Sequence, residues 1–405
     1  MDGITIGARL RTLRRWRGMT QTQVAGLAGL SPSFLSMVET GQRPLDRRSH
    51  IGAIASALRV SETDLVGGPH LTPDPIQSDP HMSIPALRAA ILSNTLTSPV
   101  AQRARALTDL AREVADEVRP ACRDANYLRA GELLPSVIDE LHVHAAEPAD
   151  EAARRLALET LVDACVAAEE TANVLGYTDL AHAAAARALE AAAVLGDPVQ
   201  QGKAAWAHVM ALPRSGMPER KLTVAERAAD QLEPHARDAL GVQILGMLTL
   251  TAAMAATVIH QDGTARAWLD EAAALASRLP DTPMVNWQLF STTNVGIWRV
   301  QVGCERGLAG AKILELAEQV DVSRVAAHSQ RRAAFLADIG RGLARDPRTR
   351  REAIQRLLQA ESAAPQWMRN NPAARGSVAY LLERATAAAG GRELRGMAAR
   401  MGLPH

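Results

Sequence analysis

Apolar residues along most of the chain recur at intervals of three and four, the spacing that places them on one face of an α-helix. Near the start, Ile6, Leu10, Leu13 and Trp16 form such a stripe, and Gly18 follows it. The sequence has no sustained alternation of apolar and polar residues of the β-branched and aromatic types that favour strands. The pattern therefore predicts an all-α protein.

Five short helices are expected between residues 4 and 66. The second begins after Thr20 and ends at Gly29, and the third begins at Ser31, a favourable N-cap, with Pro32 in its first turn. Gly29 can adopt a positive φ at the tight turn between these two helices. Two short helices joined in this way form a helix-turn-helix, in which the second helix enters the major groove of DNA with its N-terminus first.

The segment from residue 67 to residue 85 differs in composition from its surroundings. It contains five prolines and two glycines and shows no helical period. Such a composition predicts an extended linker. We therefore expect three parts in the chain: a DNA-binding head over residues 1–67, a Pro-rich linker over 68–85, and a helical domain over 86–405.

Helices follow one another between residues 86 and 402, separated by short segments rich in Gly, Pro and Asp. Large side chains recur in alternate helices at steps of 42 to 45 residues; they are Trp206, Leu248, Phe290, Phe335 and Tyr380. A helix pair repeated in this manner predicts an α-solenoid, in which each pair buries its apolar face against its neighbours. The very apolar stretch 240–259 contains Gln243 and three threonines, so we expect a buried helix and no membrane span.

Composition and charge locate a binding surface at the N-terminus. The chain carries a net charge of +1, yet its first 68 residues hold nine arginines against five acidic residues, as expected for a face that meets nucleic acid. Three widely separated cysteines, Cys122, Cys165 and Cys304, indicate reduced thiols in the cytoplasm and neither disulfides nor a zinc site. The N-terminus also has no apolar run long enough for a signal peptide.

The pattern T-Q-x-x-V-A…G-L-S-x-S-x-L-S-x-V-E-x-G-x-R-P, between Thr20 and Pro44, resembles the phage-repressor-like, xenobiotic-response-element (XRE) family of bacterial transcription regulators. The resemblance covers about residues 4–66. It implies a five-helix, lambda-repressor-like domain that binds double-stranded operator DNA, and an Arg14–Glu39 pair inside that domain. It also implies a set of DNA contacts, with Gln21 on a phosphate, Pro32, Ser33, Ser36 and Met37 facing bases, and Thr40, Gln42 and Arg43 following the backbone.

Further arginines of the head, namely Arg9, Arg11, Arg47 and Arg48, are either phosphate contacts or solvated surface residues. The base-facing positions offer no Gln, Asn or Arg, so bidentate readout of guanine or adenine is not available. Serine contacts, apolar contacts with thymine methyl groups and DNA shape would supply specificity instead. Because one such module gives limited affinity, we expect a homodimer on two half-sites about one helical turn apart.

The helical region also resembles the tetratricopeptide (TPR)-like sensor domains of regulators from Gram-positive bacteria, whose relatives include the peptide-pheromone receptors of quorum sensing. The Ala-rich helix pairs and the closing sequence AESAAPQWMRNNPAARGSVAYLLERA carry this resemblance. It implies a scaffold that dimerises and binds a peptide or small-molecule effector on its concave face.

One segment, 283–303, is expected to be a single helix with effector-binding groups on one face. The residues of that face are Trp287, Ser291, Asn294 and Trp298, spaced i, i+4, i+7 and i+11. Aromatic and amide groups suit a ligand groove, although the tryptophans could instead simply fill space between repeats. The next helix carries His328 and Arg331, which could bind a carboxylate or form a solvated face.

These features together favour a DNA-binding transcriptional regulator with a ligand-sensing repeat domain. The alternative is a protein-interaction scaffold that the head only tethers to DNA. An enzyme is not expected, because the sequence has no phosphate-cradling glycine loop, no serine nucleophile elbow and no HExxH motif. No cofactor or metal is expected either.

Overall fold

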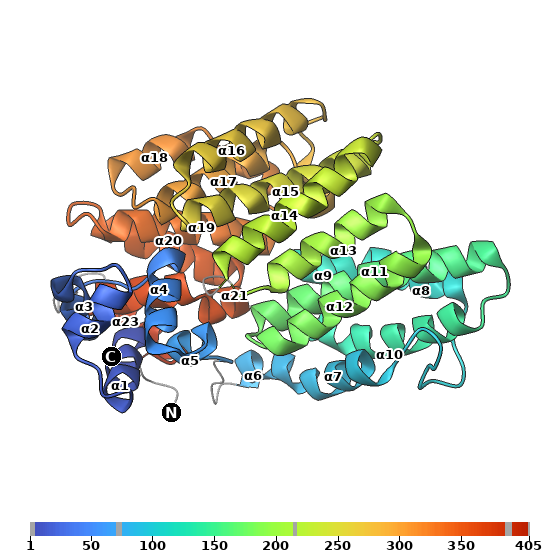
Figure 1. The fold of residues 1–405 in the computed structure, drawn as a ribbon, viewed down its shortest axis with the longest axis horizontal. Helices are drawn as coiled ribbons and strands as arrows, with labels where there is room; N and C mark the ends of the chain where they lie inside the picture. Colours follow the sequence, from blue (N-terminus) through green and yellow to red (C-terminus); the bar gives the residue numbers. More distant parts are fainter. Residues whose placement is uncertain (1–4, 70–74, 214–216, 385–390, 404–405) are drawn as a thin grey trace.

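The computed structural model describes residues 5–69, 75–213, 217–384 and 391–403 (Figure 1). Within these ranges every regular element is helical, apart from an isolated β-bridge between Thr95 and Ser98. The all-α prediction is therefore confirmed.

The head contains the five expected short helices. They are α1 (Ile6–Trp16), α2 (Gln21–Leu27), α3 (Pro32–Glu39), α4 (Arg48–Leu58) and α5 (Glu62–Val66). Local capping explains their boundaries: the Ser31 hydroxyl accepts from the Phe34 N–H at 3.1 Å, and Gly29 adopts φ +64° before α3. One expectation fails, because Trp16 is 68% exposed and not part of the α1 stripe. It is the last residue of α1, and the Arg17 guanidinium lies 4.3 Å from its ring.

The segment predicted as an extended linker is largely helical in its described part. Helices α6 (Pro75–Met82) and α7 (Ile84–Ser93) both pack against α10 (Tyr127–Ala146). The Nδ1 atom of His81 lies 3.1 Å from the Tyr177 hydroxyl, and Leu87 is fully buried. This segment therefore belongs to the repeat domain. Pro75 and Pro85 stand in first turns, where a missing N–H costs little, whereas Pro80 lies inside α6. Residues 70–74 lie outside the described residues.

The repeat domain continues with helices joined by short turns. They are α8 (Leu107–Glu113), a π-helical turn (Val114–Val118), α9 (Arg119–Arg123), α10, α11 (Glu151–Val174), α12 (Thr178–Leu195), α13 (Pro198–Ala211), α14 (Pro218–Leu232), α15 (Ala239–Val258), α16 (Asp262–Ser277), α17 (Thr292–Glu305), α18 (Ala311–Glu318), α19 (Ser329–Ala344), α20 (Arg350–Ala363), α21 (Pro365–Asn370), α22 (Pro372–Leu382) and α23 (Gly391–Arg400). From α10 to α18, neighbours in sequence pack against each other, which is the arrangement of an α-solenoid.

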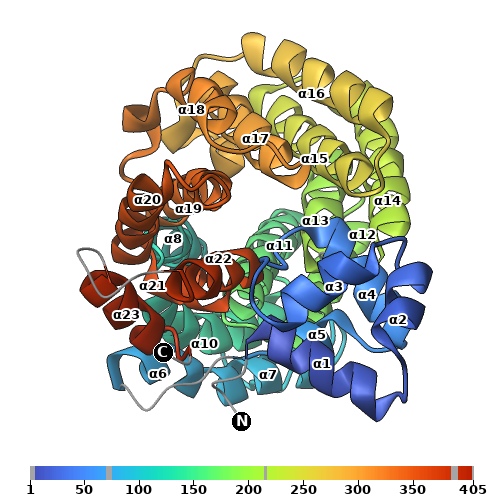
Figure 2. The same cartoon turned by 90° about the vertical axis from the view of Figure 1, so that its left-hand side faces the viewer.

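The solenoid curves into a ring (Figure 2). Helices α14, α16, α18 and α20 lie on its outside, and α13, α15, α17 and α19 lie inside. At the end of the chain α21 contacts α11 and α19 contacts α9, so the last repeats meet the first ones. The head lies beside this junction (Figure 2).

Helix α15 is the most apolar element of the array. Within the described residues it alone is long and apolar enough to cross a membrane, yet 89% of its most apolar window is buried by neighbouring helices. Packing is close here: a Cβ on Gly246 would lie 1.9 Å from Cζ of Phe290. The stretch is thus a core helix of the solenoid, as predicted, and Phe290 fills the space that a glycine leaves open.

Candidate nucleic-acid interface and effector site

Helices α2 and α3 pack around a small apolar core and leave the start of α3 free. Val24, Ala25 and Leu35 are fully buried, whereas Pro32 and Ser33 are exposed in the first turn of α3. Ser36 and Met37 follow one turn later and are half-buried. The first turn of α3 is therefore accessible to a partner, as the base-contact prediction requires.

The predicted Arg14–Glu39 pair is confirmed as an internal brace of the head. The Nε and Nη2 atoms of Arg14 donate to the two carboxylate oxygens of Glu39 at 2.5 and 2.8 Å. Burial alone would raise the pKa of Glu39, but the hydrogen bonds from Arg14 and Gln21 lower it. Gln21, predicted to hold a phosphate, donates its Nε2 to Glu39 at 2.9 Å in this structure.

The segment after α3 contacts the end of the repeat domain. The carbonyl oxygens of Gly41 (3.1 Å) and Gln42 both accept from the Arg384 guanidinium. Gly41 has φ +73°, and the Glu383 carboxylate occupies the place that a Cβ would take. Three side chains predicted to follow the DNA backbone, those of Thr40, Gln42 and Arg43, belong to exposed residues.

The start of α4 docks on α17 and α19. Asp46 accepts from Arg345 at 2.8 Å through its carboxylate, and from Arg341 at 3.1 Å through its carbonyl oxygen. The backbone N–H of Arg48 donates to Glu305 at 2.9 Å. This polar contact fixes the head on the repeat domain.

Arg47, predicted as a DNA contact, lies in the same contact with the repeat domain in this structure. A Cβ on Gly307 would lie 1.8 Å from Nη2 of Arg47, so its guanidinium rests on the repeat domain. Burial and the neighbouring Arg345 lower the pKa of Arg47. Arg48 is likewise an interface residue here, whereas Arg11 is exposed and Arg9 half-buried on α1.

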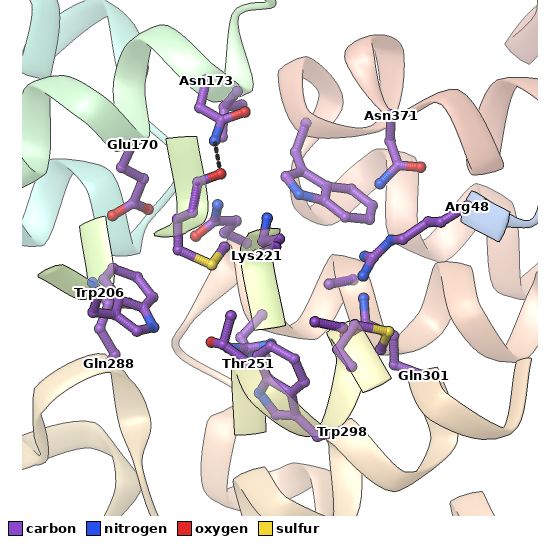
Figure 3. Close-up of a pocket in the computed structure, with 18 of the residues that line it drawn as sticks. Arg48, Glu170, Asn173, Trp206, Lys221, Thr251, Gln288, Trp298, Gln301 and Asn371 are labelled. Atoms are coloured by element: carbon purple, nitrogen blue, oxygen red, sulfur yellow. Dashed lines mark hydrogen bonds between the residues drawn. The ribbon is translucent and has the colours of Figure 1, made fainter. Parts of the chain in front are cut away.

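A cavity of about 150 Å³ opens on the inner face of the ring (Figure 3). Its wall combines tryptophans, amides and charged groups from α11, α13, α14, α15, α17 and α19, and it includes one residue of the head, Arg48. The polar and aromatic lining residues are Arg48, Glu169, Glu170, Asn173, Trp206, Lys221, Thr251, Gln288, Trp298, Gln301, Gln330, Arg331, Trp367 and Asn371. The concave face therefore holds a site of the mixed aromatic and polar kind that binds small ligands.

Two ionisable groups in this wall are strongly affected by burial. Burial raises the pKa of Glu170 to about 7, and it lowers the pKa of Arg331 to about 10 although Glu170 acts in the opposite direction. The Arg331 guanidinium also lies 5.7 Å from the Trp298 ring. Glu170 was not among the residues predicted from the sequence. Its acidic type in an Ala-rich helix was the only available signal.

The predicted single helix over 283–303 is wrong. Short 3₁₀ turns occupy Pro283–Val285 and Trp287–Leu289, and α17 begins only at Thr292. Gln288 has φ 48°, and Gln243 of α15 accepts from the Trp287 N–H at 2.7 Å, so the chain is held out of helical geometry before α17.

The four expected effector residues consequently do not share one face. Ser291 is the N-cap of α17 and accepts from the Asn294 N–H at 3.2 Å, while Asn294 donates its Nδ2 to the Gln288 carbonyl. Both are fully buried and serve the fold. Trp298 lines the cavity described above, and Trp287 lines a second one of about 180 Å³.

His328 and Arg331 are adjacent, but they line different cavities. The Nδ1 atom of His328 accepts from the Arg331 N–H at 3.2 Å, which caps α19, and burial lowers the pKa of His328 to about 3. His328 lines the second cavity and Arg331 the first, while Glu170 and Gln288 line both. Of the six expected effector residues, Trp298 and Arg331 thus share the first cavity.

Fold and site together define a helix-turn-helix head docked on a ring of helical repeats. Residues 5–66 match the family model described as "Helix-turn-helix domain", which assigns the head to that class. No curated protein matches the chain.

Two solved structures are similar to the chain at 13% sequence identity. One is PlcR of Bacillus thuringiensis in complex with the peptide PapR7 and DNA; the match covers 82% of this chain and 98% of that chain, with a TM-score of 0.36. The other is ComR from S. thermophilus in complex with DNA and its signalling peptide ComS; it covers 88% of this chain and 99% of that chain, with a TM-score of 0.25.

Proposed function

We propose that the protein is a cytoplasmic, sequence-specific DNA-binding transcriptional regulator whose repeat domain senses a peptide or small-molecule effector. The observation that carries the proposal is the exposed first turn of α3 within a helix-turn-helix domain. The Arg14–Glu39 brace supports it, because that pair holds α1 and α3 at a fixed angle. A rigid helix with a free N-terminal turn is what major-groove reading requires.

In this proposal Pro32, Ser33, Ser36 and Met37 face base edges. The exposed Thr40, Gln42 and Arg43 follow the phosphate backbone, and Gln21 is positioned by Glu39 beside them. Arg47 instead serves the head–repeat contact. The protein acts as a homodimer, because a single head without a bidentate base reader offers limited affinity.

Effector binding would act through the position of the heads. The head is held on α17 and α19 by Asp46 and by the Arg48 backbone, and these helices also form the wall of the inner cavity. A ligand that binds one arrangement of these helices better than another shifts the separation of the two heads. The match to the half-site spacing of an operator changes accordingly.

Selection of bound sequences from a random DNA library tests the proposal with the full-length protein. We expect the wild type to enrich two related half-sites, and Ser33→Ala or Met37→Ala to relax the preference at one or two positions in each half-site. Ser56→Ala, an exposed serine of α4, is the matched control and keeps the wild-type motif. The proposal is wrong if the wild type enriches no sequence, or if both α3 variants retain the motif unchanged.

A further inference from the structure

Two tryptophans in the wall of the inner cavity have indole N–H groups without a partner. Trp206 and Trp298 are each only 5% exposed, and their Nε1 atoms have no hydrogen-bond acceptor among the described residues. Trp268, by contrast, donates its Nε1 to Glu226 at 3.2 Å. Buried donors are normally satisfied, because an unmet hydrogen bond costs free energy. Both tryptophans line the cavity, so a ligand whose acceptor atoms reached these N–H groups would satisfy them.

The charges of the same wall favour an anionic occupant. It contains three basic side chains, Arg48, Lys221 and Arg331, and two acidic ones. Of the acidic residues, Glu169 accepts from Asn173 at 2.8 Å, and Glu170 is partly protonated near neutral pH because burial raises its pKa to about 7. The positive charge therefore exceeds the negative charge inside a partly enclosed, low-dielectric space, where an acid group is strongly attracted.

The head contributes one of these cations. The Arg48 side chain extends from the start of α4 into the cavity, toward Asn371 and Gln301 (Figure 3). Its Nε forms an ion pair with Glu305 at 3.8 Å, longer than a hydrogen bond, and its backbone N–H bonds the same carboxylate. The site is thus complete only while the head is docked.

These observations extend the proposed effector function, on which the following step rests. We propose that the cavity binds a compact aromatic acid, whose oxygens accept from the indoles of Trp206 and Trp298 and whose charge is balanced by Arg331, Lys221 and Arg48. A cavity of about 150 Å³ accommodates a single ring with a short acidic arm. Because head and repeat domain share the ligand, its binding stabilises the docked arrangement.

Calorimetric titration of the full-length protein without DNA tests the chemistry of the site. The probes are phenylacetate, 3-phenylpropionate and 4-phenylbutyrate, each paired with its primary amide. We expect saturable binding of at least one acid, about tenfold tighter than its amide. Arg331→Gln removes this difference, and Trp298→Phe weakens acid binding severalfold while keeping an aromatic ring. Arg332→Gln, an exposed neighbour on α19, is the matched control and leaves binding unchanged.

The role of the head is tested by Arg48→Ala and Arg48→Lys. We expect the alanine variant to lose most of the preference for acid over amide, and the lysine variant to recover part of it. In the wild type the acid should also slow proteolysis between head and repeat domain, and in Arg48→Ala it should not.

The inference is overturned if no acid binds saturably, if acid and amide bind equally, or if Arg48→Ala binds as the wild type does. Because no DNA is present, these results are independent of the sequence selection that tests the regulator itself.

Discussion

Arg341 and Glu305 form a buried ion pair at 3.0 Å, and both partners also bond the head. Arg341 donates to the Asp46 carbonyl and Glu305 accepts from the Arg48 N–H. Burial acts against the charge of Arg341, but Glu305 and Asp338 raise its pKa well above the usual value. The pair therefore stays ionised and joins α17, α19 and α4 in one polar contact.

Asp46→Ala is expected to weaken head docking. The substitution leaves the Arg345 guanidinium without its carboxylate in a largely buried contact, a loss of roughly 3–5 kcal/mol for such pairs. Hydrogen exchange of α4 should become faster, while exchange within α12 is unaffected. Arg348→Ala, which removes an exposed ion pair with Asp346, serves as the control and should change neither. Unaltered exchange of α4 in Asp46→Ala would show that this bond does not hold the head.

Glu39→Ala should destabilise the head without undocking it. Arg14 loses both carboxylate bonds and Gln21 loses its acceptor, so the expected cost is again roughly 3–5 kcal/mol. Faster exchange in α2 and α3 measures the effect. The double variant Arg14→Met/Glu39→Leu should recover much of the stability, because an apolar pair leaves no unpaired charge behind. A double variant as unstable as Glu39→Ala would argue against this explanation.

Glu170→Gln should stabilise the protein in a pH-dependent way. The folded-state pKa of Glu170, about 7, lies above its usual value of 4.5, so the folded chain binds more protons between these values. The free energy of unfolding of the wild type consequently falls as pH rises from about 4.5 through about 7. The glutamine variant does not lose this stability, because its side chain does not ionise. We expect a Tm at pH 8 about 2 °C or more above the wild type, and little difference at pH 5. An equal difference at both pH values would contradict this prediction.

His328 should act as a neutral helix cap. His328→Ala removes the acceptor for the Arg331 N–H and should cost about 1 kcal/mol in urea unfolding, whereas His328→Asn retains most of the stability. The pKa of His328 is lowered from 6.5 to about 3, so its contribution is complete above pH 6.5 and is lost as pH falls toward 3. The asparagine variant should lack this component of acid sensitivity. If alanine and asparagine variants were equally stable, the capping role would be refuted.

Gly246→Ala should be poorly tolerated. The added methyl group would meet the Phe290 ring at 1.9 Å, and overpacking of this kind costs roughly 1–3 kcal/mol. Phe290→Leu in the same chain should relieve part of the strain. On α16, Gly263→Ala is the matched control: a Cβ there meets nothing within 4 Å, so this change should be neutral or stabilising. Thermal unfolding of the three variants decides the point.

Local patterns predicted most of the head and the repeats, because caps and helical periodicity are encoded within a few residues. Ser31 and Gly29 mark the turn before α3. The Arg14–Glu39 pair, 25 residues apart, was implied instead by the family resemblance. Tertiary contacts decided the rest. Gln243, forty-four residues away in sequence, holds the Trp287 N–H and interrupts the predicted helix, and nothing local reveals that bond.

The cavity was only partly foreseeable for the same reason. Trp298 and Arg331 were expected from their types, whereas Glu170 and Arg48 reach it from α11 and from the head, far away along the sequence. Periodicity assigns a residue to a face of its own helix. It does not say which distant helix that face meets once the ring has closed.

Closure of the ring has a mechanical consequence. Since α21 contacts α11 and α19 contacts α9, the first and last repeats are not free to move apart independently. Small changes in the angles between neighbouring repeats would add up around the ring. Their sum would act on the contact between the first and last repeats. The head rests beside it, so it occupies the place where a distributed deformation of the solenoid becomes a single local displacement.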